Sequence, residues 1–236
     1  RLVHQWGWNG VTGDKPARPA ERRPVGDVGD DIPEVYICDP KNSDLSQLSH
    51  YFDETHVSSS LNGIAKICRL VVEEMEARYE FMQENFKYGS SYVDHDLLPV
   101  WLVFDEMGAF QANGTDKNSK AIVNEVMDYI RQIILKGRQA GVFILVSSQQ
   151  MSANTLNTDL RDNLGLRVAL GSNSTEGYKM VFGSASPTPQ PIEEKGAGFL
   201  YLQGSGKETA QYYEAPWVDR EKYNFIEEIK KYTSVS

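Results

Sequence analysis

The sequence lacks the features that mark several classes of protein. It has two cysteines among 236 residues, Cys38 and Cys68, and their positions match no paired metal-ligand spacing. This usage excludes a disulfide-stapled fold and favours a reduced, cytoplasmic protein. No apolar run approaches the roughly 18 residues that a membrane span requires, and the first ten residues lack the apolar core of a signal peptide. We therefore expect no membrane span within this sequence.

A surplus of basic residues is also lacking. The 33 aspartates and glutamates outnumber the 24 lysines and arginines, which gives a net charge of −9. A broad surface that coats nucleic acid is therefore not expected, whereas a local basic loop is compatible with this balance. Hydrophobic residues make up 40% and charged residues 24% of the chain, and these ordinary values exclude wholesale disorder, collagen and coiled coil.

The first 31 residues contain little that a folded core could bury. The stretch RPAERRPVGDVGDD, at 18–31, combines Pro, Arg, Gly and Asp without a period of 2 or 3.6 residues. We expect residues 1–31 to form an irregular leader and residues 32–236 to form one domain.

From residue 34 onward, short apolar strands alternate with amphipathic helices. Strands are expected at 34–38, 98–104, 142–146 and 166–170. Helices are expected at 61–86, at 119–136 with Gly137 as the stop, and at 219–232 with Asp219 as the cap. Strands at 198–202 and 209–213 flank a Gly-Ser-Gly turn and predict a hairpin. The alternation predicts a mostly parallel sheet that is covered by helices on both faces.

The histidines and cysteines give no sign of a metal site. His50, His56 and His95 lie apart in the sequence, and we interpret them as surface residues. Cys38 and Cys68 are interpreted as small core residues.

Two acidic residues end the strongest candidate motif, WLVFDE at 101–106. Ligands of an open parallel sheet bind outside the carboxyl ends of its strands, where these acids fall. In this Walker B pattern Asp105 can hold Mg²⁺, directly or through water, and Glu106 can orient and deprotonate an attacking water. The alternative is an apolar strand whose Asp merely caps the next helix.

Polar residues also follow two other predicted strands, at 142–146 and 34–38. Gln149 ends the apolar run ILVSSQ and can contact a γ-phosphate, or it is an ordinary turn residue. Asp39 and Lys41 follow the first strand in Asp-Pro-Lys. The lysine can reach toward phosphates, whereas Asp39 can equally form a local turn with the backbone.

Two arginines are further candidates. Arg138 lies between a helix and a strand, where it is either a solvated cation that complements the helix dipole or an arginine finger that reaches a neighbouring subunit. Arg167 lies in an otherwise apolar strand, so it is either structurally paired or close to phosphates.

Taken in order, these segments resemble the motor domain of FtsK/SpoIIIE-type DNA translocases, and most closely the TcpA-type coupling proteins of Gram-positive conjugative elements. The segments that carry the resemblance are VYICDPKNSDLSQL, EEMEARYEFM, LPVWLVFDEMGAF, KGRQAGVFILVSSQ, LRDNLGLRVALG and EGYKMVFG. Two departures are visible: Gln150-Met151 replaces the family's Arg-Pro after the glutamine, and the DNA-gripping winged helix is not recognised.

The resemblance implies a RecA-like P-loop NTPase fold, a three-layer sandwich with a C-terminal hairpin and helix. It implies ATP-dependent translocation of double-stranded DNA in conjugation or chromosome segregation, by a homo-hexamer with ATP and Mg²⁺ between its subunits. Asp105 then holds the metal, Glu106 activates water, Gln149 senses the γ-phosphate, and Arg138 or Arg167 acts in trans. A membrane anchor upstream would place the whole protein at the cytoplasmic face of the membrane, with relaxosome or secretion-channel proteins as partners.

A further departure concerns the phosphate-binding loop. The pattern G-x-x-x-x-G-K-[ST] occurs nowhere in the sequence. Gly10 and Gly13 resemble the first half of that loop, so these glycines and Lys15 are the candidate phosphate-binding residues of the leader. Asp14, Lys15 and Pro16 nevertheless stand where the second half of the loop should be, and prolines disfavour the helix that must open there. A nucleotide-dead interaction module of the same fold is therefore the second expectation. A metal-dependent hydrolase that uses the two acids without ATP is a third, and it requires a further ligand.

Overall fold

The computed structural model describes residues 33–53, 55–150, 155–219 and 221–231. The leader predicted at 1–31 lies outside these residues, and so do its candidate binding residues Gly10, Gly13 and Lys15. None of the helices in the described part is both long and apolar enough to cross a membrane.

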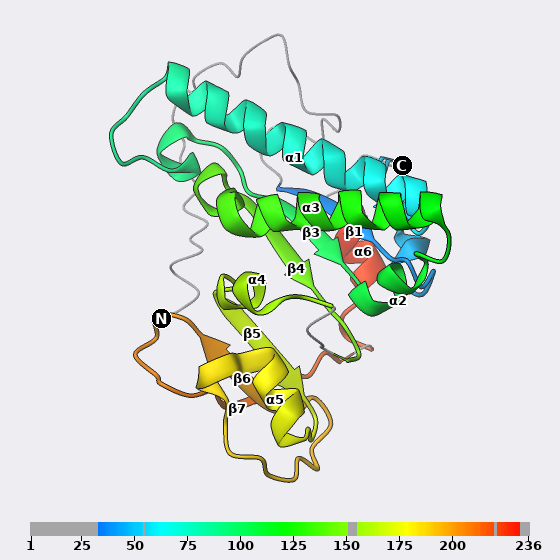
Figure 1. Ribbon diagram of the computed structural model, residues 1–236, viewed down its shortest axis with the longest axis vertical. Coiled ribbons are helices and arrows are strands. Elements are labelled where there is room, and N and C mark those ends of the chain that lie inside the picture. Colours follow the sequence, from blue (N-terminus) through cyan, green and yellow to red (C-terminus); the bar gives the residue numbers. More distant parts are fainter. Residues whose placement is uncertain (1–32, 54, 151–154, 220, 232–236) are drawn as a thin grey trace.

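A four-stranded parallel sheet, sheet A, forms the centre of the fold in the order β2-β1-β3-β4. Figure 1 labels β1, β3 and β4 of this sheet. Its strands are β1 (Glu34–Cys38), β2 (Val57–Ser58), β3 (Val100–Phe104) and β4 (Val142–Val146). Cys38 pairs with Phe104 and Phe104 with Val146, so the last residues of β1, β3 and β4 lie in one row. This register confirms the expectation that the residues after these strands meet at one edge.

Two long helices cover one face of sheet A (Figure 1). They are α1 (Leu61–Glu84), capped by Ser60, and α3 (Lys117–Ala140), capped by Asp116. Their apolar faces join alternate residues of the strands in the main core. The predicted stop of α3 at Gly137 is wrong, because the helix continues to Gly141, which has φ +74°. Gly137 is instead a packing position: a Cβ there would lie 2.2 Å from the Val142 carbonyl oxygen.

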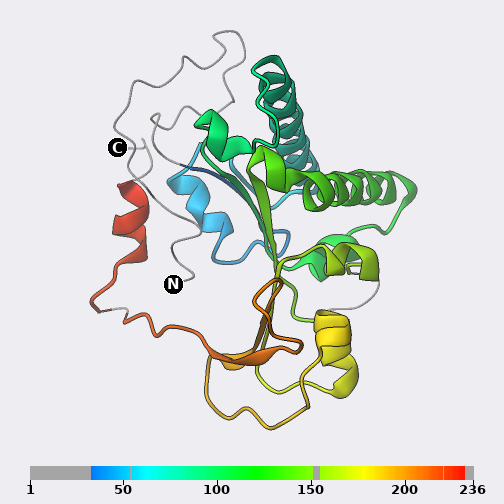
Figure 2. The ribbon, with the colours of Figure 1, turned by 90° about the vertical axis from the view of Figure 1, so that its left-hand side faces the viewer.

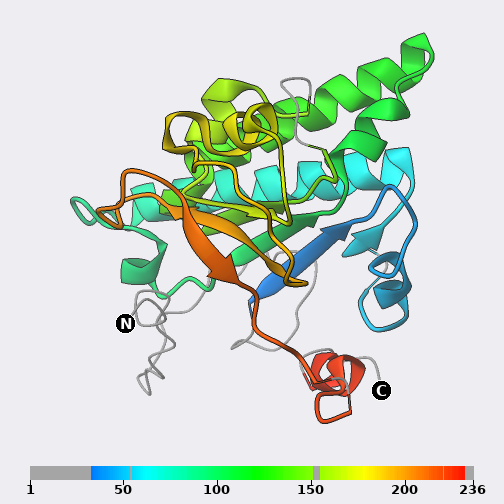
Figure 3. The ribbon, with the colours of Figure 1, turned by 90° about the horizontal axis from the view of Figure 1, so that it is seen from below.

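Shorter elements cover the opposite face of sheet A (Figure 2). The 3₁₀ helix η2 (Ser46–His50) and helix α6 (Phe225–Lys230) contribute Leu48, Ile226 and Ile229 to a core with Ile37 and Val57. The predicted terminal helix was too long: α6 begins after Asn224, which caps it in place of Asp219. After β7 (Gln211–Glu214), in the second sheet, the chain returns to sheet A and forms α6 (Figure 3).

A second, antiparallel sheet, sheet B, has the order β5-β6-β7. It consists of β5 (Leu166–Leu170), β6 (Ala197–Leu202) and β7 (Gln211–Glu214), and the last two confirm the predicted hairpin. The expectation that 166–170 joins the parallel sheet is wrong, because β5 pairs antiparallel with β6. Within the described residues β4 and β5 are both edge strands, and Leu145, Leu166 and Leu170 on them are each about half exposed.

The remaining elements connect these layers. They are η3 (Tyr92–His95), α2 (Met107–Ala112), α4 (Thr158–Asp162), α5 (Thr175–Phe182) and η4 (Gly183–Ala185). Helix α5 packs Tyr178 and Phe182 against Phe199 of sheet B, which gives this sheet a small core of its own.

Of the three histidines expected on the surface, His50, His56 and His95, two are buried. His56 is 1% exposed and stacks on Tyr36, with ring centroids 4.6 Å apart. His95 packs against the Phe81 ring, and its Nε2 lies 2.9 Å from the Ser90 hydroxyl. Aromatic partners from other elements cover both rings. Cys38 and Cys68 are fully buried and unpaired, as predicted.

Candidate functional site

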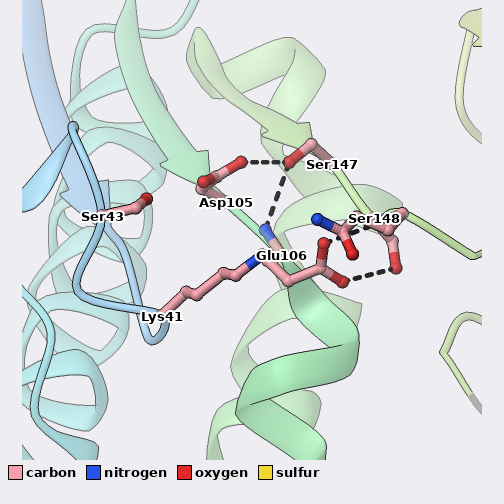
Figure 4. Close-up of a pocket in the computed structure, with 7 residues that line it drawn as sticks. Lys41, Ser43, Asp105, Glu106, Ser147 and Ser148 are labelled. Carbon is pink, nitrogen blue, oxygen red and sulfur yellow. Dashed lines mark hydrogen bonds between the residues drawn. The ribbon is translucent and has the colours of Figure 1, made fainter. Parts of the chain in front are cut away.

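A cavity of about 360 Å³ opens at the carboxyl edge of sheet A. The loops after β1, β3 and β4 line it with Lys41, Ser43, Asp105, Glu106, Ser147, Ser148 and Gln149 (Figure 4). Four residues singled out from the sequence, Lys41, Asp105, Glu106 and Gln149, are thus brought together. The parallel register explains this juxtaposition, since each of the three loops starts at the same level of the sheet.

The loop after β1 is organised by Asp39, whose side chain is fully buried. Its carboxylate accepts hydrogen bonds from the backbone N–H groups of Ser43, at 2.7 Å, and Ser46, at 2.9 Å. Asp39 therefore serves the local turn, which was the alternative reading of the Asp-Pro-Lys motif, and it does not line the cavity. The turn presents Ser43 and Lys41 to the cavity, and the Lys41 side chain extends toward Glu106 (Figure 4).

Asp105 lies directly after β3 and is tied to both neighbouring strands. Its backbone N–H donates to the Cys38 carbonyl of β1 at 2.8 Å. Its carboxylate accepts a hydrogen bond from the Ser147 hydroxyl, which follows β4. The Ser147 oxygen also accepts from the Glu106 N–H at 3.2 Å, so a single hydroxyl bridges the two acidic residues.

Glu106 occupies the left-handed region, with φ +48° and ψ +67°, which side-chain-bearing residues rarely adopt. This backbone turns the chain sharply from β3 into α2, and the Met107 N–H donates to the Ser147 carbonyl at 3.0 Å. The Glu106 carboxylate is bonded on both oxygens: Ser148 Oγ donates to Oε1 at 3.1 Å and the Gln149 N–H donates to Oε2 at 3.0 Å. Such conformations cost about 1–3 kcal/mol and cluster at functional sites.

The oxygen atoms around the cavity can serve as some of the ligands of a hard cation, if water or a substrate supplies the others. The Asp105 carboxylate and the Ser43 and Ser147 hydroxyls are oxygen ligands of the type that Mg²⁺ prefers. No group of three His, Cys, Asp or Glu side chains able to enclose a metal occurs in the described residues. Mg²⁺ is commonly held by one or two carboxylates together with water and substrate phosphates, and this site fits that pattern.

The structure does not bring the other predicted residues to this cavity. Arg138 lies exposed in the last turn of α3, next to the start of β4 and hence at the opposite edge of the sheet. The Arg167 guanidinium pairs with Asp162 at 3.2 Å, donates to the Phe182 carbonyl at 3.1 Å and lies over the Tyr201 ring. Burial lowers the pKa of Arg167, while the charge of Asp162 opposes that effect. Arg167 thus has the structural partners that its position in an apolar strand required.

Three residues that line the cavity have no role predicted from the sequence: Ser43, Ser147 and Ser148. Ser147 and Ser148 stand between the apolar run of β4 and Gln149, and each hydroxyl contacts one of the two acids. The signal was available, because a pair of hydroxyls at the end of a strand adjacent to the acid-bearing strand falls beside the acids. The pairing of β4 with β3 confirms the expectation that Gln149 and the two acids follow neighbouring strands, and it places both serines there as well.

Comparison with known proteins places this arrangement in context. A scan against models of known protein families finds no match. The chain is 35% identical over 199 residues to the FtsK domain-containing protein YdcQ of Bacillus subtilis, a match that covers 84% of this chain and 40% of the relative. It is 25% identical over 186 residues to the DNA translocase SftA of the same organism, covering 73% of this chain and 18% of that protein. The chain thus spans less than half the length of these curated relatives.

Solved structures share the fold. The pCW3 conjugation coupling protein TcpA, in its monomer form with ATPγS, matches with a TM-score of 0.70 and 15% identity, over 86% of this chain and 57% of that one. EssC (ATPases 2 and 3) of Geobacillus thermodenitrificans matches with a TM-score of 0.57 and 17% identity, over 84% and 36%. At these identities the likeness shows the fold alone.

Proposed function

Because the chain contains an FtsK-type motor domain, with the α/β architecture of P-loop ATPase motors, we propose that it is the motor domain of an ATP-dependent translocase of double-stranded DNA. The observation that carries this proposal is the convergence of Asp105, Glu106 and Gln149 at the ends of two paired parallel strands. In P-loop NTPases a Walker B Asp holds Mg²⁺ and a further residue positions the attacking water, and the acid pair facing Gln149 supports these two roles.

Each residue of the cavity has a distinct task in this proposal. Asp105, oriented by Ser147, holds Mg²⁺, which supplies charge neutralisation for the phosphates. Glu106 orients a water molecule and accepts its proton. Gln149 contacts the γ-phosphate, and Lys41 adds a positive charge on the opposite wall of the cavity.

The second candidate is a nucleotide-dead module with the same fold, which contacts partners without binding ATP. The absence of G-x-x-x-x-G-K-[ST] from the sequence favours it, because the N–H groups and lysine of that loop are the main phosphate ligands. Binding of Mg·ATP separates the two candidates.

Thermal unfolding with and without Mg·ATP is the test. A ligand present at 100 times its Kd stabilises the folded state by about 2.7 kcal/mol. For a domain of this size that corresponds to a rise in Tm of about 5–11 °C. The rise should disappear in Asp105→Asn and when EDTA removes Mg²⁺. An unchanged Tm at millimolar Mg·ATP would establish the nucleotide-dead module.

DNA binding is tested on the same protein. The net charge of −9 leaves a restricted surface for the phosphate backbone, such as the lining of a central channel. We expect duplex DNA to stimulate ATP turnover and to bind with an affinity that falls steeply with salt, because each phosphate contact releases a counterion. Tight binding that does not respond to salt would contradict this role.

The assembly completes the proposal. We propose that residues 32–236 act in a homo-hexamer in which Arg138, exposed at the end of α3, reaches the site of the neighbouring subunit. A membrane anchor upstream and relaxosome or secretion-channel partners would place the motor in conjugation. If Arg138 acts in trans, mixing Arg138→Ala with Glu106→Gln subunits should restore turnover at mixed interfaces. A mixture as inactive as its components would refute the trans role.

A further inference from the structure

The contacts of Ser148 assign it a task beyond lining the cavity. We infer that Ser148 is a positioning residue that holds the Glu106 carboxylate over the cavity, and that it releases this carboxylate by turning its hydroxyl to the Gln150 carbonyl. The inference rests on the proposed function for its catalytic consequence. The contact itself is independent of that function.

The first observation is that the position of the Glu106 carboxylate is fixed by its backbone and by two hydrogen bonds. Its backbone is in the left-handed region, and both carboxylate oxygens are bonded to consecutive residues after β4, Ser148 and Gln149. The Gln149 donor is a backbone N–H, so it cannot rotate independently of the chain. Ser148 supplies the one donor of this pair that can rotate away.

The second observation is that Ser148 faces two acceptors with a single proton. Its Oγ lies 3.1 Å from Glu106 Oε1 and 3.0 Å from the Gln150 carbonyl oxygen. A hydroxyl donates one hydrogen bond at a time. The charged carboxylate is the stronger acceptor and receives the hydrogen bond while it lies against Ser148 at the cavity. When the carboxylate swings toward a water molecule, the hydroxyl keeps a partner in the Gln150 carbonyl, so release leaves no unpaired donor.

The third observation is the bare backbone opposite this contact. A Cβ added at Gly108, in the first turn of α2, would lie 3.2 Å from Glu106 Oε1 and 3.5 Å from Ser148 Oγ. The glycine has an ordinary backbone conformation, since its φ is not positive. A side chain at this position would therefore crowd the Glu106 carboxylate and lie against its serine partner.

The contact is tested first on the free protein by ¹³C NMR of labelled glutamate carboxyls at fixed pH. Glu106→Gln identifies the Glu106 resonance by its loss. We expect Ser148→Ala to displace that resonance and Ser148→Thr, which keeps the hydroxyl, to leave it near its wild-type position. Ser186→Ala is the matched control, because Ser186 likewise donates to a local carbonyl, that of Gly183, away from the cavity.

The catalytic consequence is tested by DNA-stimulated ATP turnover of the same variants. Ser148→Ala should lower kcat about tenfold or more, the effect of losing one hydrogen bond to a charged group, while KM for Mg·ATP stays within about twofold. Ser148→Thr should restore kcat, and Ser186→Ala should not change it.

The outcomes separate the inference from the function on which it rests. An unmoved Glu106 resonance in Ser148→Ala, or a kcat unchanged by that substitution, overturns the positioning role. An equal loss in Ser148→Thr and Ser148→Ala also overturns it, because the hydroxyl would then be irrelevant. If the wild type has no ATP turnover, the proposed function fails, and the NMR displacement alone decides whether Ser148 holds Glu106.

Discussion

Replacing Arg78 with Met should destabilise the fold strongly, although Arg78 lies far from the cavity. Arg78 belongs to the segment EEMEARYEFM and is 7% exposed. Its Nε pairs with Glu74 at 2.6 Å, and its Nη1 donates to the carbonyls of Leu98, at 2.7 Å, and Ala140, at 3.2 Å. One guanidinium thus fastens α1 to the approach of β3 and to the end of α3.

The magnitude follows from what the substitution leaves behind. Methionine fills most of the volume, but the largely buried Glu74 carboxylate is left without its partner, and two backbone carbonyls lose their donor. Breaking a buried pair by removing one member costs about 3–5 kcal/mol. In a domain of this size that loss lowers Tm by about 6–20 °C.

Urea unfolding followed by circular dichroism measures the effect. Arg69→Met is the matched control on the same helix, because its ion pair with Glu125 is exposed; its unfolding midpoint should stay close to that of the wild type. The double variant Glu74→Gln/Arg78→Met should recover part of the loss, since it removes the stranded charge. A midpoint for Arg78→Met that matches Arg69→Met would refute this reasoning.

Two further predictions concern the packing of the main domain. Gly137→Ala should cost about 1–3 kcal/mol in urea unfolding, because the new Cβ meets the Val142 carbonyl, whereas Gly165→Ala has open space and should cost far less; equal costs would show that the close approach is unimportant. Burial lowers the pKa of His56, so the unfolded chain takes up a proton near pH 6.5 while the folded chain does not. Stability should therefore fall as the pH drops below about 6.5, and His56→Phe should flatten this dependence; parallel curves for both proteins from pH 5 to 8 would contradict the assignment.

Much of sheet A could be predicted because its strands are short apolar runs with clear polar ends. Asp-Pro follows residues 34–38, and Ser-Ser follows residues 142–146. The structure gives β1 and β4 these same bounds. The juxtaposition of the cavity residues could be predicted as well, because the residues that follow buried parallel strands lie at one edge of the sheet. The acids and Gln149 could therefore be brought together without knowledge of side-chain contacts.

The features that escaped prediction depend on contacts between distant elements. Strand β2 has two residues and no periodic signal. The β5 run is apolar like the parallel strands, and only its pairing with β6 shows that it belongs to another sheet. The sequence predicts a helix stop at Gly137, whereas the structure requires a glycine there because the Val142 carbonyl oxygen approaches closely. The burial of His56, in the turn before β2, depends in the same way on Tyr36 of β1.

The division of labour between the two acids is tested most directly by Glu106→Gln. Binding of Mg·ATP and DNA-stimulated turnover should be measured side by side for this variant and the wild type. Glutamine preserves the shape of the side chain but cannot accept the proton, so Mg·ATP affinity should stay within about threefold while turnover falls by about 10²–10⁴. Turnover that is equal in both proteins, or absent from the wild type, would contradict the assignment of Glu106 as the residue that activates water.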